Sequence, residues 1–167
     1  MPVPSDVINE LAGVDAESRL GKMRADRIET FEFAQGSFLA LLEPGDPAGV
    51  SRLERESIAL RVATLERSQA LIDFHTDRLL AQGADESYIA SIVDFPEGFK
   101  GDDRLRAIVK HVDLLTCSSR NGSPGAIANL KAAGLTDRDI VTVSQLIAYL
   151  SYEIRLIATL RALQEVA

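Results

Sequence analysis

Apolar residues recur at intervals of three and four along most of the chain, which is the spacing of one buried face of an α-helix. Alternation of period two, the mark of a half-buried strand, is rare, and aromatic residues make up only 5%. The pattern therefore predicts an all-α protein. Polar caps and glycine or proline breakers divide the expected helices at about residues 5–11, 15–42, 51–83, 85–93, 102–115, 123–134 and 136 to the C-terminus.

The firmest break in the pattern is the sequence Glu43-Pro44-Gly45-Asp46-Pro47. Two prolines and a glycine so close together cannot continue a helix. The residues before this break are too few to fold by themselves. We therefore expect a single domain over residues 1–167, in which an N-terminal helical arm (1–45) precedes a core (46–167).

The helical segment of residues 51–83 is too long for a compact domain of this size. It opens with a capping box, in which Ser51 takes the cap position and Glu54 follows three residues later. A continuous helix over this segment would be about 48 Å long at 1.5 Å per residue. We therefore expect a break within it, although no glycine or proline marks the place.

The last predicted helix is apolar around most of its circumference. Such a helix is either central to the core or covered on a second side by another subunit. In so small a chain we expect both, and hence a homo-oligomer. Two series repeat every seven positions along it: Ile140, Ile147 and Ile154, and Val143, Leu150 and Ile157.

A short pattern occurs twice along the chain. A leucine is followed by a glycine four residues later and by an isoleucine six residues after the glycine, and a new helix is expected after each glycine. The pattern indicates either a duplicated helical unit or two ordinary glycine C-caps, and the sequence leaves both open. The two copies are Leu79, Gly83 and Ile89, and Leu130, Gly134 and Ile140.

Composition argues against several classes of function. The net charge of −7, without any basic cluster, disfavours binding to nucleic acid or to anionic membranes. No run approaches the roughly 18 apolar residues of a membrane span, and residues 1–6 lack the features of a secretory signal. The single cysteine, Cys117, allows no intrachain disulfide. We expect a cytoplasmic protein without a cofactor.

Glu56 and His75 are the main candidates for chemistry, because each lies among apolar neighbours. A carboxylate and an imidazole beside apolar walls can have shifted pKa values and can exchange protons. In a continuous helix they would be about 28 Å apart, so a site exists only if the chain turns between them. The structural alternatives are a buried histidine without chemistry and an ion pair of Glu56 with Arg52, Arg55 or Arg155.

Other polar residues carry weaker signals. Ser68 is expected to be a helix cap, and a triad of Ser68, His75 and Asp73 is disfavoured because no Gly-x-Ser-x-Gly elbow is present. No paired ligand spacing of the HExxH or CxxC kind occurs, so no metal site is expected. We interpret His111 as a surface or helix-packing residue and Cys117 as a buried or half-buried thiol.

Within residues 54–83, Glu56 is followed by Ser68 twelve residues later, by Leu71 three residues after that and by His75 four further on. This spacing resembles the core motif of the AhpD-like branch of the carboxymuconolactone decarboxylase family. That motif has a glutamate, two cysteines and a histidine at these four places. The resemblance therefore assigns the glutamate to Glu56, the histidine to His75 and the two cysteine positions to Ser68 and Leu71.

The resemblance covers roughly residues 15–165. Residues 130–140 and the helix that follows them resemble the second half of the family, and residues 41–44 resemble the arm of its peroxidase-related members. It implies an AhpD-like helical bundle with an N-terminal helical arm, a helix break near Ser68, and assembly as a trimer or hexamer.

The chain departs from the family at both cysteine positions. In the family the two cysteines cycle between dithiol and disulfide, while the glutamate and histidine move the protons. A peroxide is reduced by a thiolate, and neither the hydroxyl of Ser68 nor the side chain of Leu71 can take that part. Cys117 has no resolving partner in the same chain. The resemblance thus relates the chain to peroxidase-type oxidoreductases without their disulfide mechanism.

Three functions remain open. The first is cysteine-independent acid–base chemistry on a small organic molecule, similar to a carboxymuconolactone decarboxylase-like lyase, with Glu56 and His75 exchanging protons and Ser68 donating a hydrogen bond. The second is a non-catalytic oligomeric protein that binds a small molecule or serves as a scaffold. The third is an inherited peroxidase activity. Filling of the site by Leu71 and Phe74, with no cavity, would favour the scaffold.

Overall fold

The all-α prediction is confirmed in the computed structural model, which describes residues 4–166. Over this range the chain forms helices and turns, and no strand. The helices are α1 (Val7–Ala12), α2 (Arg19–Ala25), α3 (Ile28–Leu42), α4 (Arg52–Leu65), α5 (Gln69–Ala81), α6 (Glu86–Val93), α7 (Asp103–Ser118), the 3₁₀-helix η1 (Ser119–Asn121), α8 (Pro124–Ala132) and α9 (Asp137–Glu165).

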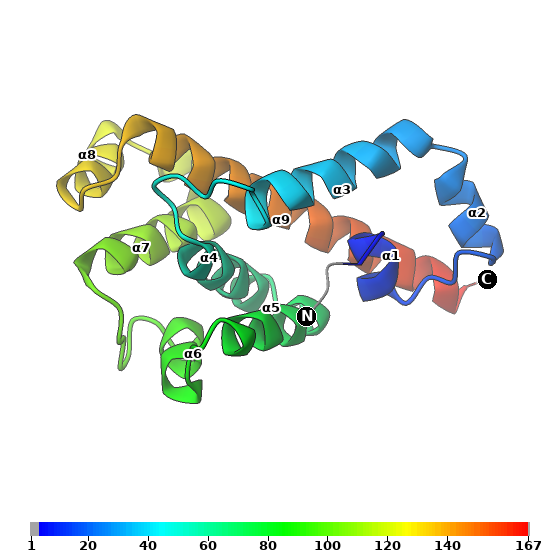
Figure 1. Ribbon diagram of the computed structural model, residues 1–167, viewed down its shortest axis with the longest axis horizontal. Helices are drawn as coiled ribbons and strands as arrows, with labels where there is room; N and C mark the ends of the chain where they lie inside the picture. Colours follow the sequence, from blue (N-terminus) through cyan, green and yellow to red (C-terminus); the bar gives the residue numbers. More distant parts are fainter. Residues whose placement is uncertain (1–3, 167) are drawn as a thin grey trace.

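The long helix α9 forms the axis of the molecule (Figure 1). Helices α1 and α3 of the arm pack along it, and α4 packs against it from the core. Helices α1 and α2 lie at one end of the molecule with the C-terminus, whereas α7 and α8 lie toward the other end (Figure 1). Because α4 contacts α5, α6, α7 and α9, it is the most central element and the natural support for a site.

Two hydrophobic clusters hold the helices together. The larger cluster joins the arm to the core, since Phe38 and Leu42 of α3 are buried with residues of α4, α5 and α9. The smaller cluster surrounds α6, where Ile92 is fully buried beside Leu60 of α4. Burial of apolar surface contributes roughly 25 cal/mol per Å² and is the main stabilising term.

Helix α9 is long and apolar enough to cross a membrane by length and composition alone, with a mean hydropathy of 1.3 over its most apolar window. The expectation that no segment could do so, which considered only unbroken apolar runs, is therefore too strict. Half of this window is buried inside the fold. Packing against α1, α3, α4 and α7 accounts for the apolar character of the helix.

The prediction of one helix over residues 15–42 is wrong, because the structure has two helices there, α2 and α3. The side chain of Ser18 caps α2 by accepting a hydrogen bond of 3.0 Å from the amide of Gly21. Gly21 lies so close to the loop before it that a Cβ atom would be 2.3 Å from the carbonyl oxygen of Asp15. The chain leaves α2 at Asp26 without a glycine or proline, so no sequence signal marks this break.

The repeated leucine–glycine pattern corresponds to two glycine C-caps of the same geometry. Gly83 and Gly134 have φ angles of 88° and 86°, in the left-handed region that glycine adopts without strain. In each case the amide after the glycine donates a hydrogen bond of 3.1 Å to the carbonyl of the leucine, Leu79 or Leu130. These are the bonds of a Schellman motif, so both glycines are C-caps, a geometry that a duplicated helical unit would share.

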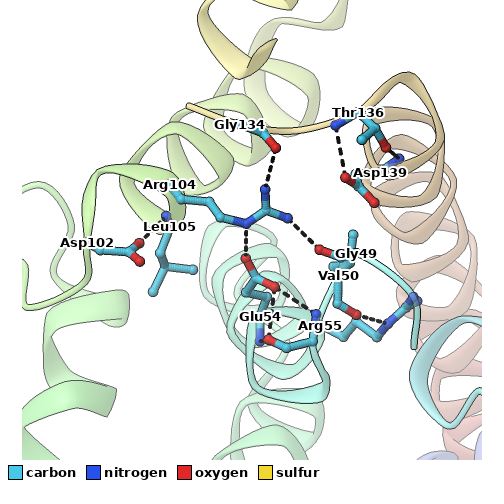
Figure 2. Close-up of polar contacts among 11 residues, drawn as sticks. Gly49, Val50, Glu54, Arg55, Asp102, Arg104, Leu105, Gly134, Thr136 and Asp139 are labelled. Atoms are coloured by element: carbon cyan, nitrogen blue, oxygen red, sulfur yellow. Dashed lines mark hydrogen bonds and ion pairs between the residues drawn. The ribbon is translucent and has the colours of Figure 1, made fainter. Parts of the chain in front are cut away.

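Arg104 joins the starts of three helices (Figure 2). From the first turn of α7, its Nε donates to Glu54 Oε1 of α4 at 2.8 Å, and its Nη1 donates to the carbonyl of Gly134, before α9, at 3.1 Å. Its Nη2 donates to the carbonyl of Gly49. Beside it, Thr136 and Asp139 form the capping box of α9. The single guanidinium thus fixes the beginnings of α4, α7 and α9 relative to one another.

Candidate functional site

The expected break between α4 and α5 is present and forms a Schellman motif. The amide of Ser68 donates to the carbonyl of Ala63 at 2.9 Å, and the amide of Arg67 donates to that of Thr64 at 3.1 Å. Arg67 takes the left-handed position with φ 57°, which glycine normally occupies. The chain therefore reverses at residues 66–68, and α5 packs back against α4.

This reversal brings Glu56 and His75 into direct contact. His75 Nδ1 lies 2.8 Å from Glu56 Oε2, and both side chains are 0% exposed. The Nε of Arg78, one turn further along α5, donates to Glu56 Oε1 at 2.8 Å. Arg78 also bonds the half-buried Glu43, which follows α3. The four side chains form one buried ion network that joins α3, α4 and α5.

Aromatic rings enclose this network. The guanidinium of Arg78 lies 5.7 Å from the ring centroid of Phe38 and 5.4 Å from that of Phe74, within the range of cation–π contacts. The Phe74 ring also meets the His75 ring edge-on, with centroids 5.1 Å apart. The charged cluster is thus shielded from solvent by apolar groups, which strengthens its internal attractions.

Arg78, and not the arginines proposed from the sequence, is the cationic partner of Glu56. Arg52 pairs with Glu43 instead, at 3.4 Å, and the guanidinium of Arg155 lies 3.9 Å from Glu66. The signal was available, because Arg78 lies three residues after His75 and so shares its face of the helix. Arg78 could be assigned as the partner of Glu56 only once the turn between α4 and α5 was known, because that turn brings the two helices together.

The charges of the network decide the protonation of Glu56. Burial acts to raise the pKa of this carboxyl, but the hydrogen bonds and charges of His75 and Arg78 outweigh it and lower the pKa below its ordinary value. Burial likewise acts to lower the pKa of Arg78, and its bonds to Glu56 and Glu43 raise it instead. Glu56 is therefore ionised and Arg78 is charged at neutral pH.

A second buried carboxyl, Glu153 of α9, was missed by the sequence reasoning. It is 0% exposed, and it accepts a hydrogen bond of 3.2 Å from the hydroxyl of Tyr149. Burial, together with the negative charge of Glu56, raises the pKa of Glu153 to about 8. Glu153 lies seven residues after Leu146 and seven before Leu160, so it shares their face of α9. A carboxylate at a position between two apolar ones is the sequence signal by which it could have been identified.

One ring nitrogen and one carboxyl oxygen of this region, His75 Nε2 and Glu153 Oε2, lack a hydrogen-bond partner within residues 4–166. Buried polar atoms without a partner are uncommon and costly. An ionised carboxylate, an imidazole and a carboxyl that titrates near neutrality can in principle hold and pass a proton. Neither His75 nor Glu56 exposes any surface, however, so a substrate would have to reach them through a change in packing.

The two positions that resemble the family's cysteines are also inside the fold. Leu71 is 0% exposed and belongs to the larger hydrophobic cluster. Ser68 is half-buried and takes the N-cap position of α5, but its side chain makes no capping hydrogen bond, so the expected side-chain cap is absent.

The remaining candidates lie away from the Glu56–His75 pair. Cys117, near the end of α7, is exposed, which corrects the expectation of a buried or half-buried thiol. His111 is 6% exposed and packs within the helices, as one of its two interpretations predicted. No group of three or more His, Cys, Asp or Glu side chains within residues 4–166 is placed to hold a metal ion.

No protein-family model matches this sequence, and no curated protein matches it. Solved structures do match the fold. An uncharacterized peroxidase-related protein from Silicibacter sp. TM1040 is 19% identical with a TM-score of 0.74, over 95% of this chain and 84% of that one. An uncharacterized peroxidase-related protein with an alkylhydroperoxidase AhpD core, from Ralstonia eutropha JMP134, is 17% identical with a TM-score of 0.73, over 95% and 88% of the two chains.

A protein of unknown function from Agrobacterium tumefaciens is similar to the same degree, at 20% identity and a TM-score of 0.73, over 87% of this chain and 96% of the other. At these identities the likeness defines the fold and not the activity. The expected AhpD-like helical fold is therefore confirmed, and the activity has to be argued from the site.

Proposed function

We propose that this protein is an oligomeric binding protein that keeps the AhpD-like fold, takes up a small organic molecule and does not reduce peroxides. The observation that argues against peroxide reduction is the state of the Glu56–His75 pair, which is fully buried and held by Arg78 in a closed ion network, as expected of a scaffold. Uptake of a small molecule is supported instead by a separate cavity between α7 and α8. Leu71, at the second cysteine position, is part of the hydrophobic core. The region that would process a peroxide therefore serves to hold α3, α4 and α5 together.

The direct test is consumption of cumene hydroperoxide in the presence of a dithiol reductant. We expect no turnover above that of the buffer, because a serine hydroxyl and a leucine cannot replace two thiols. The Cys117→Ser variant should behave identically, since Cys117 is an exposed thiol with no second cysteine in the chain to resolve it. Turnover by the wild-type protein would contradict the proposal, and turnover that survives Cys117→Ser would contradict its chemical basis as well.

The proposed oligomer, a trimer or hexamer, is supported by an exposed apolar strip on α3 and α9. Phe33 of α3 is 72% exposed and Tyr152 of α9 is 40% exposed. Phe33 and Tyr152 line one groove, together with Tyr149. Apolar residues gathered in this way are typical of surfaces that bind another chain, and a second copy of this chain is the occupant that the apolar last helix led us to expect.

Light scattering at micromolar concentration tests the assembly. We expect the mass of a trimer or hexamer for the wild-type protein and a smaller mass for Phe33→Glu, which places a charge in the groove. Glu32→Gln, a change of one charge at the neighbouring exposed position, is the matched control and should leave the mass unchanged. A monomeric wild-type protein would contradict the oligomer.

A second candidate function, acid–base catalysis of the lyase-like kind, is favoured by one specific observation. Glu56 and His75 are in contact at 2.8 Å, and the pKa of nearby Glu153 lies at about 8, where a general acid or base works best. In this proposal Glu56 and His75 exchange protons with a small organic acid, and Ser68 donates a hydrogen bond. A turnover screen that finds a substrate, followed by equal activity in His75→Ala, would remove this candidate.

A further inference from the structure

A separate cavity of about 350 Å³ lies between α7 and α8. Its volume is within the range of small-molecule sites, roughly 300–1,000 Å³. Apolar side chains of Ala107, Leu114 and Ala126 form part of its wall. The polar lining residues are Arg106, Lys110, His111 and Asn129.

The lining is basic in a protein that is acidic as a whole. The chain carries a net charge of −7, yet the cavity is lined by Arg106 and Lys110 and by no acidic residue. Neither cation forms an ion pair with a carboxylate among residues 4–166. The Arg106 guanidinium is held against the Phe99 ring, 4.7 Å from its centroid, which keeps it in place at the cavity.

His111 supplies an independent indication that the cavity takes a ligand. The residue is 6% exposed, and its Nδ1 has no hydrogen-bond partner within the described part of the chain. Its other ring nitrogen has only a long contact of 3.5 Å with the hydroxyl of Ser144. A buried imidazole nitrogen without a partner beside an empty volume is satisfied when a polar ligand occupies that volume.

Two segments of three helices each have the same pattern of helix caps, which allows their residues to be compared position by position. The segments α4–α5–α6 and α7–α8–α9 carry equivalent signals at a constant offset of 51 residues. Each begins at an N-cap whose side chain accepts from the third residue after it, ends its second helix at a left-handed glycine, and starts its third helix at another such N-cap. The pairs are Ser51 and Asp102, Gly83 and Gly134, and Asp85 and Thr136.

At this offset, the buried trio of the first segment corresponds to small residues in the second. Glu56, His75 and Arg78 correspond to Ala107, Ala126 and Asn129. All three of these counterparts line the cavity. Large, mutually neutralising side chains fill the space between α4 and α5, and their replacement by small ones leaves a void between α7 and α8, which close packing does not otherwise tolerate.

We propose that the cavity between α7 and α8 binds a small organic carboxylate, with Arg106 and Lys110 holding the anion, His111 and Asn129 completing its hydrogen bonds, and Ala107, Leu114 and Ala126 covering its apolar body. This inference rests on the proposed binding function and names the ligand class and its site. Arginine recognises a carboxylate through two parallel hydrogen bonds. The apolar wall favours an organic acid over a bare inorganic anion.

Calorimetric titration with benzoate tests the proposal, with benzamide as its neutral counterpart and inorganic phosphate as the bare anion. We expect benzoate to bind at least tenfold more tightly than benzamide, because only the anion forms charge-assisted hydrogen bonds with Arg106 and Lys110. We also expect it to bind at least tenfold more tightly than phosphate, because only benzoate has an apolar body to bury against Ala107, Leu114 and Ala126. Ala126→Leu, which fills the cavity, should abolish binding, and Arg106→Gln should weaken it at least tenfold. Arg19→Gln, the same change on exposed α2, should leave it unaltered.

Circular dichroism of each variant separates loss of the site from loss of the fold. Equal affinity for benzoate and phosphate would overturn the carboxylate assignment, and binding that survives Ala126→Leu would overturn the site. Absence of benzoate binding in the wild-type protein would overturn this inference alone, since the proposed function is tested independently by peroxide turnover. Peroxide turnover together with intact benzoate binding would overturn the proposed function, while the inference that the cavity binds a carboxylate would stand.

Discussion

The hairpins α4–α5 and α7–α8 share their helix caps but differ in what lies between their helices. Between α4 and α5, Glu56, His75 and Arg78 fill the space and neutralise one another. Between α7 and α8, the space is open, and the cations Arg106 and Lys110 have no carboxylate partner among residues 4–166. The backbone thus sets the positions of the helices, whereas side-chain volume and charge decide whether the space between them is packed or open.

The filled hairpin α4–α5 also explains why an intact glutamate and histidine do not by themselves indicate catalysis. A buried ion network depends on every member, because removal of one leaves the others charged and desolvated. Selection for folding alone would then retain Glu56 and His75. In the hairpin α7–α8 no such network constrains Arg106, whose guanidinium lies over the Phe99 ring.

The largest effect is expected from Glu56→Gln, which removes the charge that Arg78 requires. We expect a loss of roughly 3–5 kcal/mol in the free energy of unfolding, measured by urea denaturation at pH 7. The exposed Glu32→Gln should change stability by less than about 0.5 kcal/mol. Because the folded-state pKa of Glu56 is lowered, its contribution is present above the ordinary value of 4.5 and is lost as the pH falls below it.

If Glu56→Gln left the free energy of unfolding unchanged, the ion network would not be what stabilises the packing of α4 against α5. The pH series gives a second check, since the difference between wild type and Glu56→Gln should shrink on acidification. A difference that stayed constant from pH 7 down to the acid limit of folding would mean that the carboxylate charge is not responsible.

Glu153→Gln should stabilise the protein by roughly 3 kcal/mol at pH 7. The folded pKa of Glu153 is raised from 4.5 to about 8, so the folded state holds a proton that the unfolded state releases. Stability of the wild type therefore falls as the pH rises from about 4.5 toward 8, and the neutral amide removes this slope. Denaturation curves at pH 5 and pH 8 measure it, and parallel pH profiles for the two proteins would contradict the prediction.

Gly134→Ala and Gly83→Ala compare the C-caps of the two hairpins. We expect each to cost about 1–2 kcal/mol, because a left-handed φ strains any residue with a Cβ. An added Cβ meets no atom within 4 Å at either position, so the cost is conformational and should be equal in the two hairpins. Thermal unfolding measures it, and a much larger cost at one site would break the equivalence of the two segments.

The smallest effect is expected from Arg67→Gly in the turn between α4 and α5. Arg67 is exposed and holds a left-handed φ of 57°, so glycine should relieve strain and stabilise the protein by about 0.5–1 kcal/mol. Arg120→Gly, at an exposed position that has no left-handed φ, is the control and should not stabilise. A destabilising Arg67→Gly would indicate that the arginine side chain matters to the turn.

Much of the candidate site could be predicted because it depends on local signals. The length of residues 51–83 indicated a turn, and the resemblance of the spacing of Glu56, Ser68 and His75 to the AhpD-like motif indicated where it lies. Other features had no local signal. The break between α2 and α3 carries neither glycine nor proline, and the exposure of Cys117 depends on how α7 packs.

Periodicity, capping residues and helix length act within a few turns of chain, so the sequence alone predicts the all-α class and the order of the caps. It allowed Glu56 to meet His75 only on the condition that the chain turns between them. Only the tertiary structure decided that Arg78 completes this pair, that Glu153 is buried beside it, and that small residues leave a basic cavity between α7 and α8. These depend on which side chains from distant segments share one volume, and packing in three dimensions alone sets that volume.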